Sequence, residues 1–83
     1  MSLNAEIAEI FYQKAQILQG KGDRYKFRAL AYIRAAKAIE GLDRGLDEMY
    51  AQGWLVGLQR IPGIGNRLAH DIETELKKRG KAG

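Results

Sequence analysis

The sequence predicts an all-α fold, a compact bundle of about four to five helices. Apolar residues recur at the three- and four-residue spacing that places them on one face of a helix. No window of five or more residues alternates between apolar and polar side chains, and the single proline lies in a turn segment, so strands are not expected. Because 83 residues leave room for one hydrophobic core, residues 1–83 are expected to form a single domain.

Five helical segments follow from the apolar spacing and from the glycines and turn residues that interrupt it. They cover approximately residues 4–20, 24–41, 43–53, 54–60 and 66–79. Asn4 and Asp43 are the expected N-caps of the first and third segments. Ile17 and Phe27 fall on the predicted inward faces of the first two, and Trp54, beside a leucine, is assigned to the core. The alanines of the second segment predict close contact with a neighbouring helix.

The positive charge of the chain is modest but unevenly distributed. The formal net charge is +4, and residues 24–39 contain no acidic side chain. The basic residues of that stretch are Arg24, Lys26, Arg28, Arg34 and Lys37. A second basic group closes the chain, with Lys77, Lys78, Arg79 and Lys81. Charge alone favours a solvated helix surface and a nucleic-acid-binding surface about equally.

Several classes of protein are disfavoured by what the sequence lacks. It has no cysteine and a single histidine, His70, so neither disulfides nor a thiolate or imidazole metal site is expected. No apolar run approaches the length of a membrane span, and acidic residues stand where a secretory signal would be basic. We therefore expect an intracellular protein without a membrane partner, cytoplasmic and nucleoid-associated if prokaryotic.

The segment Ile61-Pro62-Gly63-Ile64-Gly65 predicts a tight turn between two helices. Its glycines can adopt positive φ, and they allow another molecule to approach the main chain. The first amides of the following helix are unpaired donors backed by the helix dipole, which suits a DNA phosphate. The expected DNA contacts at this turn are Arg60, Gly63, Ile64, Gly65, Asn66 and Arg67. A dinucleotide fingerprint and a P-loop are excluded, because the third glycine and the Gly-Lys-Ser/Thr sequence are missing.

The longer pattern Leu58-x-x-Ile61-Pro62-Gly63-Ile64-Gly65-x-x-Leu68-Ala69-x-x-Ile72 resembles the helix-hairpin-helix family. That resemblance implies binding of duplex DNA without sequence preference, through main-chain amides on phosphates. It also implies a monovalent cation, K⁺ or Na⁺, on the backbone carbonyls of Gln59, Ile61 and Ile64, and no other cofactor is expected. An αα-hairpin that serves only packing or protein association is the alternative.

Nearly the whole chain resembles the amino-terminal domain of family X DNA polymerases, the polymerase beta group, in its bacterial and archaeal style. The resemblance runs through residues 4–8, residues 26–39 and the hairpin. It implies recognition of a 5′-phosphate at a gapped or nicked duplex in DNA repair, including base excision repair. By position, Arg28 and Arg67 replace phosphate-binding lysines and Tyr32 matches a pocket tyrosine. We expect Arg34 near the same phosphate.

Three positions depart from this resemblance. Asp71 stands where the animal enzymes carry a lyase lysine, Phe27 replaces a pocket histidine, and Gln59 replaces a basic residue near the hairpin. A Schiff-base nucleophile must be an amine, so the domain is expected to be a monomeric DNA-binding module without a catalytic residue. Two alternatives stay open: a deoxyribose-phosphate lyase using a substitute lysine, of which Lys78 returns to roughly the right helix face, and a protein-association module.

Overall fold

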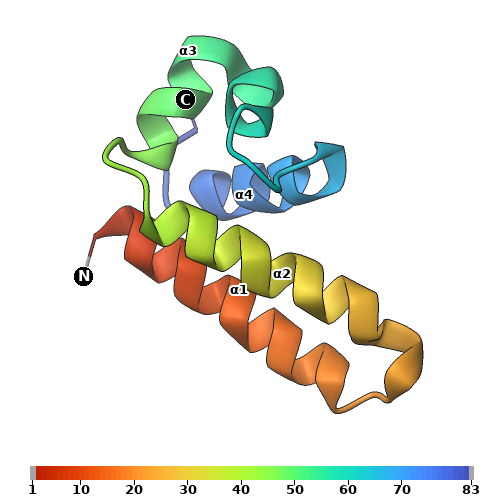
Figure 1. Ribbon diagram of the computed structural model, residues 1–83. Coiled ribbons are helices and arrows are strands. Elements are labelled where there is room, and N and C mark those ends of the chain that lie inside the picture. Colours follow the sequence, from red (N-terminus) through yellow and green to blue (C-terminus); the bar gives the residue numbers. More distant parts are fainter. Residues whose placement is uncertain (1, 83) are drawn as a thin grey trace.

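Four α-helices and one short 3₁₀ turn make up the computed structural model, which describes residues 2–82. The helices are α1 (Leu3–Gln19), α2 (Lys26–Glu40), α3 (Leu46–Gln59) and α4 (Asn66–Lys78), and the 3₁₀ turn η1 (Asp23–Tyr25) leads into α2 (Figure 1). Residues 2–82 contain no strand, which confirms the predicted all-α fold. None of the helices in this range is long and apolar enough to cross a membrane.

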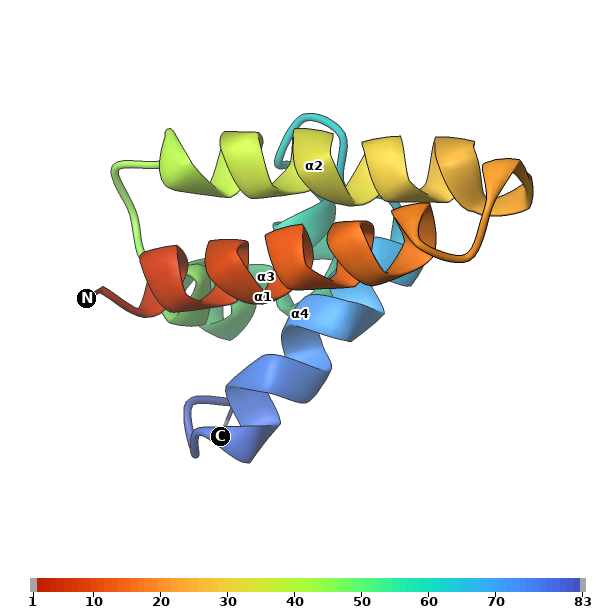
Figure 2. The same cartoon turned by 90° about the horizontal axis from the view of Figure 1, so that it is seen from below.

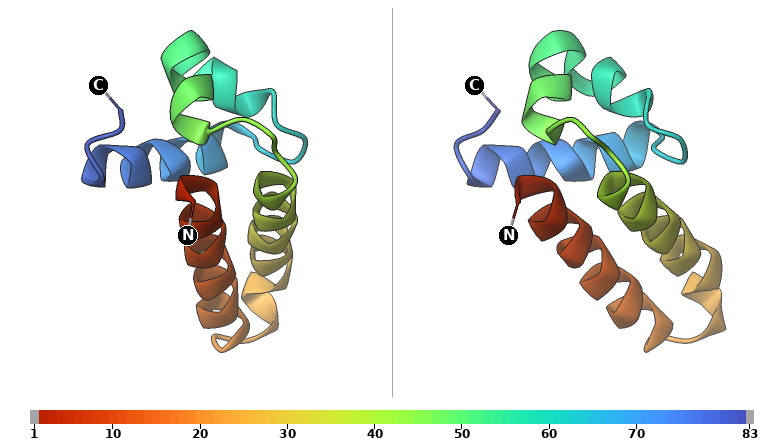
Figure 3. Two further views of the ribbon diagram at one scale, coloured as in Figure 1. Left: turned by 90° about the vertical axis from the view of Figure 1, so that its left-hand side faces the viewer. Right: turned by 60° about the vertical axis from the view of Figure 1, so that its left-hand side comes forward.

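The helices form two pairs. α1 and α2 run side by side in opposite directions, as Figure 2 shows from below. α3 and α4 lie across one end of this hairpin, where α1 begins and α2 ends, and the opposite end projects away from them (Figure 3). The turn between α3 and α4 therefore reaches the side of α2 rather than the loop end of the first pair.

Small side chains bring α1 and α2 close together, as the alanine content predicts. Five alanines in these two helices are at most 1% exposed: Ala8, Ala15, Ala29, Ala35 and Ala36. The large core residues come from all four helices and from the hairpin: Ile7, Phe11, Ile39, Leu46, Leu58, Ile61, Ile72 and Leu76. Burying a side chain of this size contributes about 1.5–3 kcal/mol, so the core joins the two pairs into one unit.

Neither of the two predicted N-caps, Asn4 and Asp43, caps the helix for which it was predicted. α1 begins two residues earlier than predicted, and its N-cap is Ser2, whose hydroxyl accepts a hydrogen bond from the Ala5 amide at 3.1 Å. Asn4 lies inside α1 and caps α3 instead of α1. Its side-chain oxygen accepts from the Leu46 amide at 2.9 Å, while its side-chain amide donates to the Arg44 carbonyl at 2.7 Å. Asp43 is not a cap, because α3 starts after Gly45.

The third and fourth predicted helices are one kinked element, α3. The kink lies at Trp54, which has φ 53° and ψ −133°, a conformation that a residue with a side chain rarely adopts. Trp54 is not a core residue: it is 71% exposed, and its ring stacks on Tyr50 with 6.5 Å between centroids. The reversed backbone at the kink directs the indole outward, against the prediction.

Two other apolar side chains that were predicted to face inward are exposed. Ile17 is 60% exposed in the last turn of α1, and Phe27 is 82% exposed in the first turn of α2. Both lie toward the projecting end of the first helix pair, where α1 and α2 have only each other to pack against (Figure 3). Helical periodicity identifies one face of each helix, but it does not indicate how far along that face a neighbour extends.

Candidate nucleic-acid interface

The turn between α3 and α4 is anchored by its isoleucines and exposed at its glycines. Ile61 and Ile64 are 2% and 4% exposed, and the Ile64 amide donates to the Ile61 carbonyl at 3.0 Å. Gly63 has φ 84°, the left-handed conformation that favours glycine, as predicted for this turn. Gly63 and Gly65 are both exposed. The core thus fixes the turn from below while its main chain stays accessible from outside.

The start of α4 leaves its backbone donors without protein partners. Gly65 is the N-cap and provides no side-chain cap. Among residues 2–82, the amides of Gly63, Gly65, Asn66 and Arg67 donate no hydrogen bond. The start of α1, by contrast, is capped by Ser2. An uncapped and exposed helix start offers amide hydrogens and a positive dipole end to an external anion.

A pocket joins this helix start to α2. It has a volume of about 330 Å³ and is lined by Arg28, Ala31 and Tyr32 of α2 and by residues 65–68. The fold therefore brings Arg28 and Tyr32 beside Gly65, Asn66 and Arg67, as the sequence predicts. A second pocket of about 260 Å³ adjoins it, sharing Arg28 and Tyr32 and extending toward α1. We call the two pockets together the Tyr32 groove.

A family model described as a helix-hairpin-helix domain matches residues 2–81. The chain belongs to this family. No curated protein and no solved structure matches the chain significantly. Helix-hairpin-helix domains typically bind DNA, and the hairpin of this one is residues 61–65. The closer resemblance to family X polymerases stays a prediction.

Tyr32 is the centre of the groove in this helix-hairpin-helix domain. Its side chain is 8% exposed, and its hydroxyl donates to the Asp71 carboxylate at 2.6 Å. The Phe11 ring packs edge-on against it at 5.2 Å, and the Lys14 amine lies 6.0 Å from its ring centre. Burial, followed by the hydrogen bond to Asp71, raises the pKa of Tyr32 to about 12, although nearby Arg28 acts to lower it. Tyr32 therefore stays neutral, with its hydroxyl hydrogen already bonded.

The cations of the groove differ from those at the end of the chain. Within residues 2–82, no carboxylate lies within ion-pair distance of Lys14, Arg28 or Arg67. The basic residues of the last turn are paired with glutamates: Lys77 with Glu73 at 3.8 Å, and Lys78 and Arg79 with Glu75 at 3.5 and 2.9 Å. Of the two basic groups in the sequence, the second is thus largely neutralised locally, and the substitute lysine Lys78 lines neither pocket.

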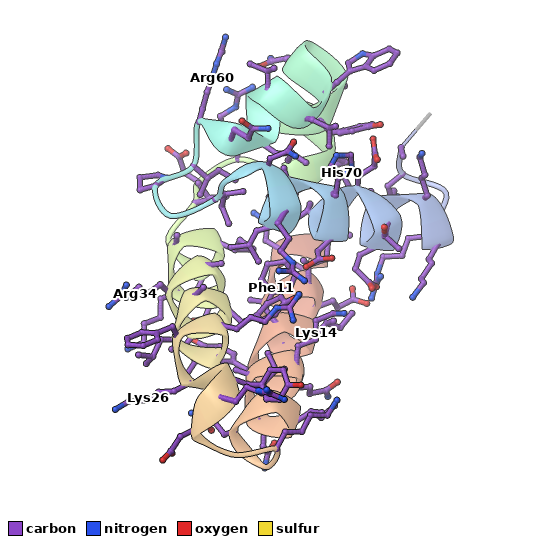
Figure 4. The ribbon with its side chains drawn as sticks, turned by 90° about the vertical axis from the view of Figure 1, so that its right-hand side faces the viewer. Phe11, Lys14, Lys26, Arg34, Arg60 and His70 are labelled. Carbon is purple, nitrogen blue, oxygen red and sulfur yellow. The ribbon has the colours of Figure 1, made fainter. Side chains whose placement is uncertain are left out.

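Two predicted contacts lie outside the groove. Arg34 follows Tyr32 by two residues, so its side chain is rotated by roughly 200° around α2. Figure 4 shows Arg34 and Lys26 projecting from the edge of α2 that faces away from α1, and neither lines a pocket of the groove. Arg34 thus leaves α2 on a different side from Arg28 and Tyr32, and its contact with the same phosphate stays a prediction. Arg60 is exposed at the end of α3 and points away from the other helices (Figure 4).

Lys14 is the charged residue of the groove that the sequence did not indicate. It follows the buried Phe11 by three residues, so both side chains lie on the same side of α1, below α4 in Figure 4. A lysine three residues after a core phenylalanine is a recognisable pattern. Nothing in the sequence, however, showed that this side of α1 meets Tyr32.

The carbonyls proposed for a monovalent cation lie around the hairpin. The oxygens of Gln59 and Ile64 accept no hydrogen bond from residues 2–82, whereas the Ile61 oxygen accepts one from Ile64. The Gln59 side chain donates a long hydrogen bond, 3.4 Å, to the Asn66 side chain across the turn. Free carbonyl lone pairs are ligands that suit hard cations, so this donor set fits K⁺ or Na⁺. No cluster of three or more His, Cys, Asp or Glu side chains in the described residues could hold another metal.

Proposed function

We propose that this domain binds duplex DNA without sequence preference and prefers a nicked or gapped duplex that carries a 5′-phosphate. It would act in DNA repair, as the amino-terminal domain or a stand-alone relative of a family X polymerase. One observation carries the proposal: the uncapped start of α4 opens into the same pocket as Arg28 and Arg67. Main-chain amide donors and the two arginines thus line one pocket, which is large enough to hold a phosphate.

The preference for a strand end follows from charge. A terminal phosphate monoester carries about −1.5 to −2 at neutral pH, whereas a phosphodiester within a strand carries one negative charge. Two guanidinium groups and a helix dipole attract the more highly charged group more strongly, and guanidinium can bind it with two parallel hydrogen bonds. We assign K⁺ or Na⁺ to the carbonyls of Gln59, Ile61 and Ile64, where its charge would add to the attraction.

We assign no catalysis to the domain and expect it to bind as a monomer. The carboxylate of Asp71 cannot form a Schiff base with an abasic sugar, and its oxygen is engaged by the Tyr32 hydroxyl. Lys77 and Lys78 of α4 are paired with glutamates. Absence of a borohydride-trapped adduct on abasic DNA would agree with this assignment, and a trapped adduct lost on lysine substitution would contradict it.

The test is a titration of labelled blunt, nicked and gapped duplexes, each with and without a 5′-phosphate. With about three to five phosphate contacts, the logarithm of affinity should fall with the logarithm of salt with a slope of roughly −3 to −4. Arg67→Gln should reduce the magnitude of this slope by about one. Lys77→Gln is the matched control, because that lysine is paired with Glu73 and lies outside the groove. Binding that does not depend on salt would contradict the proposal, and so would an oligomer that does not bind DNA.

Replacement of Asp71 by asparagine should strengthen binding of the 5′-phosphate. Asparagine keeps an oxygen that can accept from the Tyr32 hydroxyl but removes a negative charge beside the groove. A partly exposed charge interaction is worth up to about 1 kcal/mol, which corresponds to about fivefold in affinity. The measurement compares gapped duplexes with and without the 5′-phosphate. A gain of the same size on both would place the effect of Asp71 elsewhere on the DNA.

A further inference from the structure

The second pocket of the Tyr32 groove has features that a terminal phosphate does not require. Its lining combines the apolar side chains of Ile17 and Leu18 and the Tyr32 ring with two cations, Lys14 and Arg28. Ile17 is 60% exposed and so lines an open surface instead of joining the core. An apolar wall flanked by cations suits a group that is part apolar and part anionic, which describes a nucleotide.

Continuity with the first pocket indicates the direction of the strand. Arg28 and Tyr32 line both pockets, so a molecule whose phosphate meets the start of α4 can extend past Tyr32 toward α1. Lys14 lies at that far side, with its amine 6.0 Å from the Tyr32 ring centre. The carboxylate of Asp71 accepts the hydrogen bond of the Tyr32 hydroxyl, and Asp71 lines neither pocket.

We propose that this second pocket is a nucleotide subsite, and that Lys14 binds the first internucleotide phosphate of the strand whose 5′-phosphate occupies the first pocket. The inference rests on the proposed function, and it adds α1 to the DNA-binding surface. The sugar and base of the terminal nucleotide lie against Ile17, Leu18 and the Tyr32 ring. Lys14 then acts as a cation on a bridging phosphate, a contact that is independent of whether the 5′ end is phosphorylated.

The experiment uses the full chain and a gapped duplex in two forms. In one form the first internucleotide linkage downstream of the gap is a normal phosphodiester, and in the other it is an uncharged methylphosphonate. Lys14→Gln should weaken binding of the phosphodiester form about fivefold, as expected for one partly exposed charge contact. It should have no effect on the methylphosphonate form. Lys14→Arg should retain the wild-type affinity on both, because it keeps the charge.

Lys37→Gln is the matched control, since Lys37 is an exposed lysine on α2 that lines neither pocket. An equal loss for Lys14→Gln on both linkages would overturn the subsite, and so would a loss that appears only when the 5′-phosphate is present. Circular dichroism of each variant verifies the fold. Failure of the proposed function has a different signature, because the wild type would then not distinguish a 5′-phosphate from a 5′-hydroxyl.

Discussion

Replacement of Gly65 by glutamate should lower the affinity for DNA about a hundredfold, equivalent to the loss of a charge-assisted hydrogen bond and the addition of a like charge. Gly65 is the exposed N-cap of α4, and it has an ordinary φ of −91°. Apart from Gly65 and its two chain neighbours, no heavy atom of residues 2–82 lies within 4 Å of the position that a Cβ would occupy there. The variant should therefore fold, with its carboxylate in front of the amides that we assign to phosphate.

The same substitution should not reduce stability, because a carboxylate at a helix start interacts favourably with the dipole by about 0.3–1 kcal/mol. Thermal unfolding should show an unchanged or slightly higher Tm, while fluorescence anisotropy shows the loss of DNA binding. Gly65→Ala is the uncharged control and should retain most of the affinity. A folded Gly65→Glu variant that binds as tightly as the wild type would remove the hairpin from the interface.

Replacement of Gly57 by alanine should destabilise the domain by about 3 kcal/mol, the upper part of the range for forcing extra atoms into a packed site. Gly57 is buried in α3, just after the kink at Trp54. A Cβ there would clash with the backbone carbonyl of Met49, one turn before the kink. Main chain cannot move aside as the end of a flexible side chain can. The measurement is the free energy of unfolding from urea denaturation.

Gly53 provides the matched control for this experiment. It lies in the same helix, and a Cβ at Gly53 would have no neighbour within 4 Å. Gly53→Ala should leave stability unchanged or raise it by up to about 1 kcal/mol, because alanine restricts the unfolded chain. If Gly57→Ala proved as stable as Gly53→Ala, the close approach of Gly57 to Met49 across the kink would be refuted.

The hairpin was predictable because its determinants are local. The spacing of Ile61 and Ile64 fixes the buried side of the turn, and Gly63 supplies the positive φ, all within a few residues of sequence. The exposed Trp54 was not predictable in this way. An indole next to a leucine normally indicates core, and only the reversed backbone at the kink directs it outward. The predictions for Ile17 and Phe27 failed for a different reason, because the burial of a helix face depends on where the other helices lie.

The same distinction between local patterns and contacts of distant segments applies to the candidate site. Arg28 and Tyr32 are one turn apart on α2, so their common side follows from helical geometry, and the structure places both beside the start of α4. Arg34 was grouped with them on charge, although two residues of helix turn it to another side. Lys14 depends on which side of α1 meets Tyr32, a relation between distant segments that no local pattern encodes.

The hydrogen bonds of Asn4 connect the first turn of the chain to the entrance of α3, across about half its length. Fraying of α1 from its amino end would thus release the start of α1 and the start of α3 together. α3 leads directly into the hairpin. We therefore expect the two helix pairs to unfold together, so that the amides of α1 and those around the hairpin exchange with solvent at similar rates.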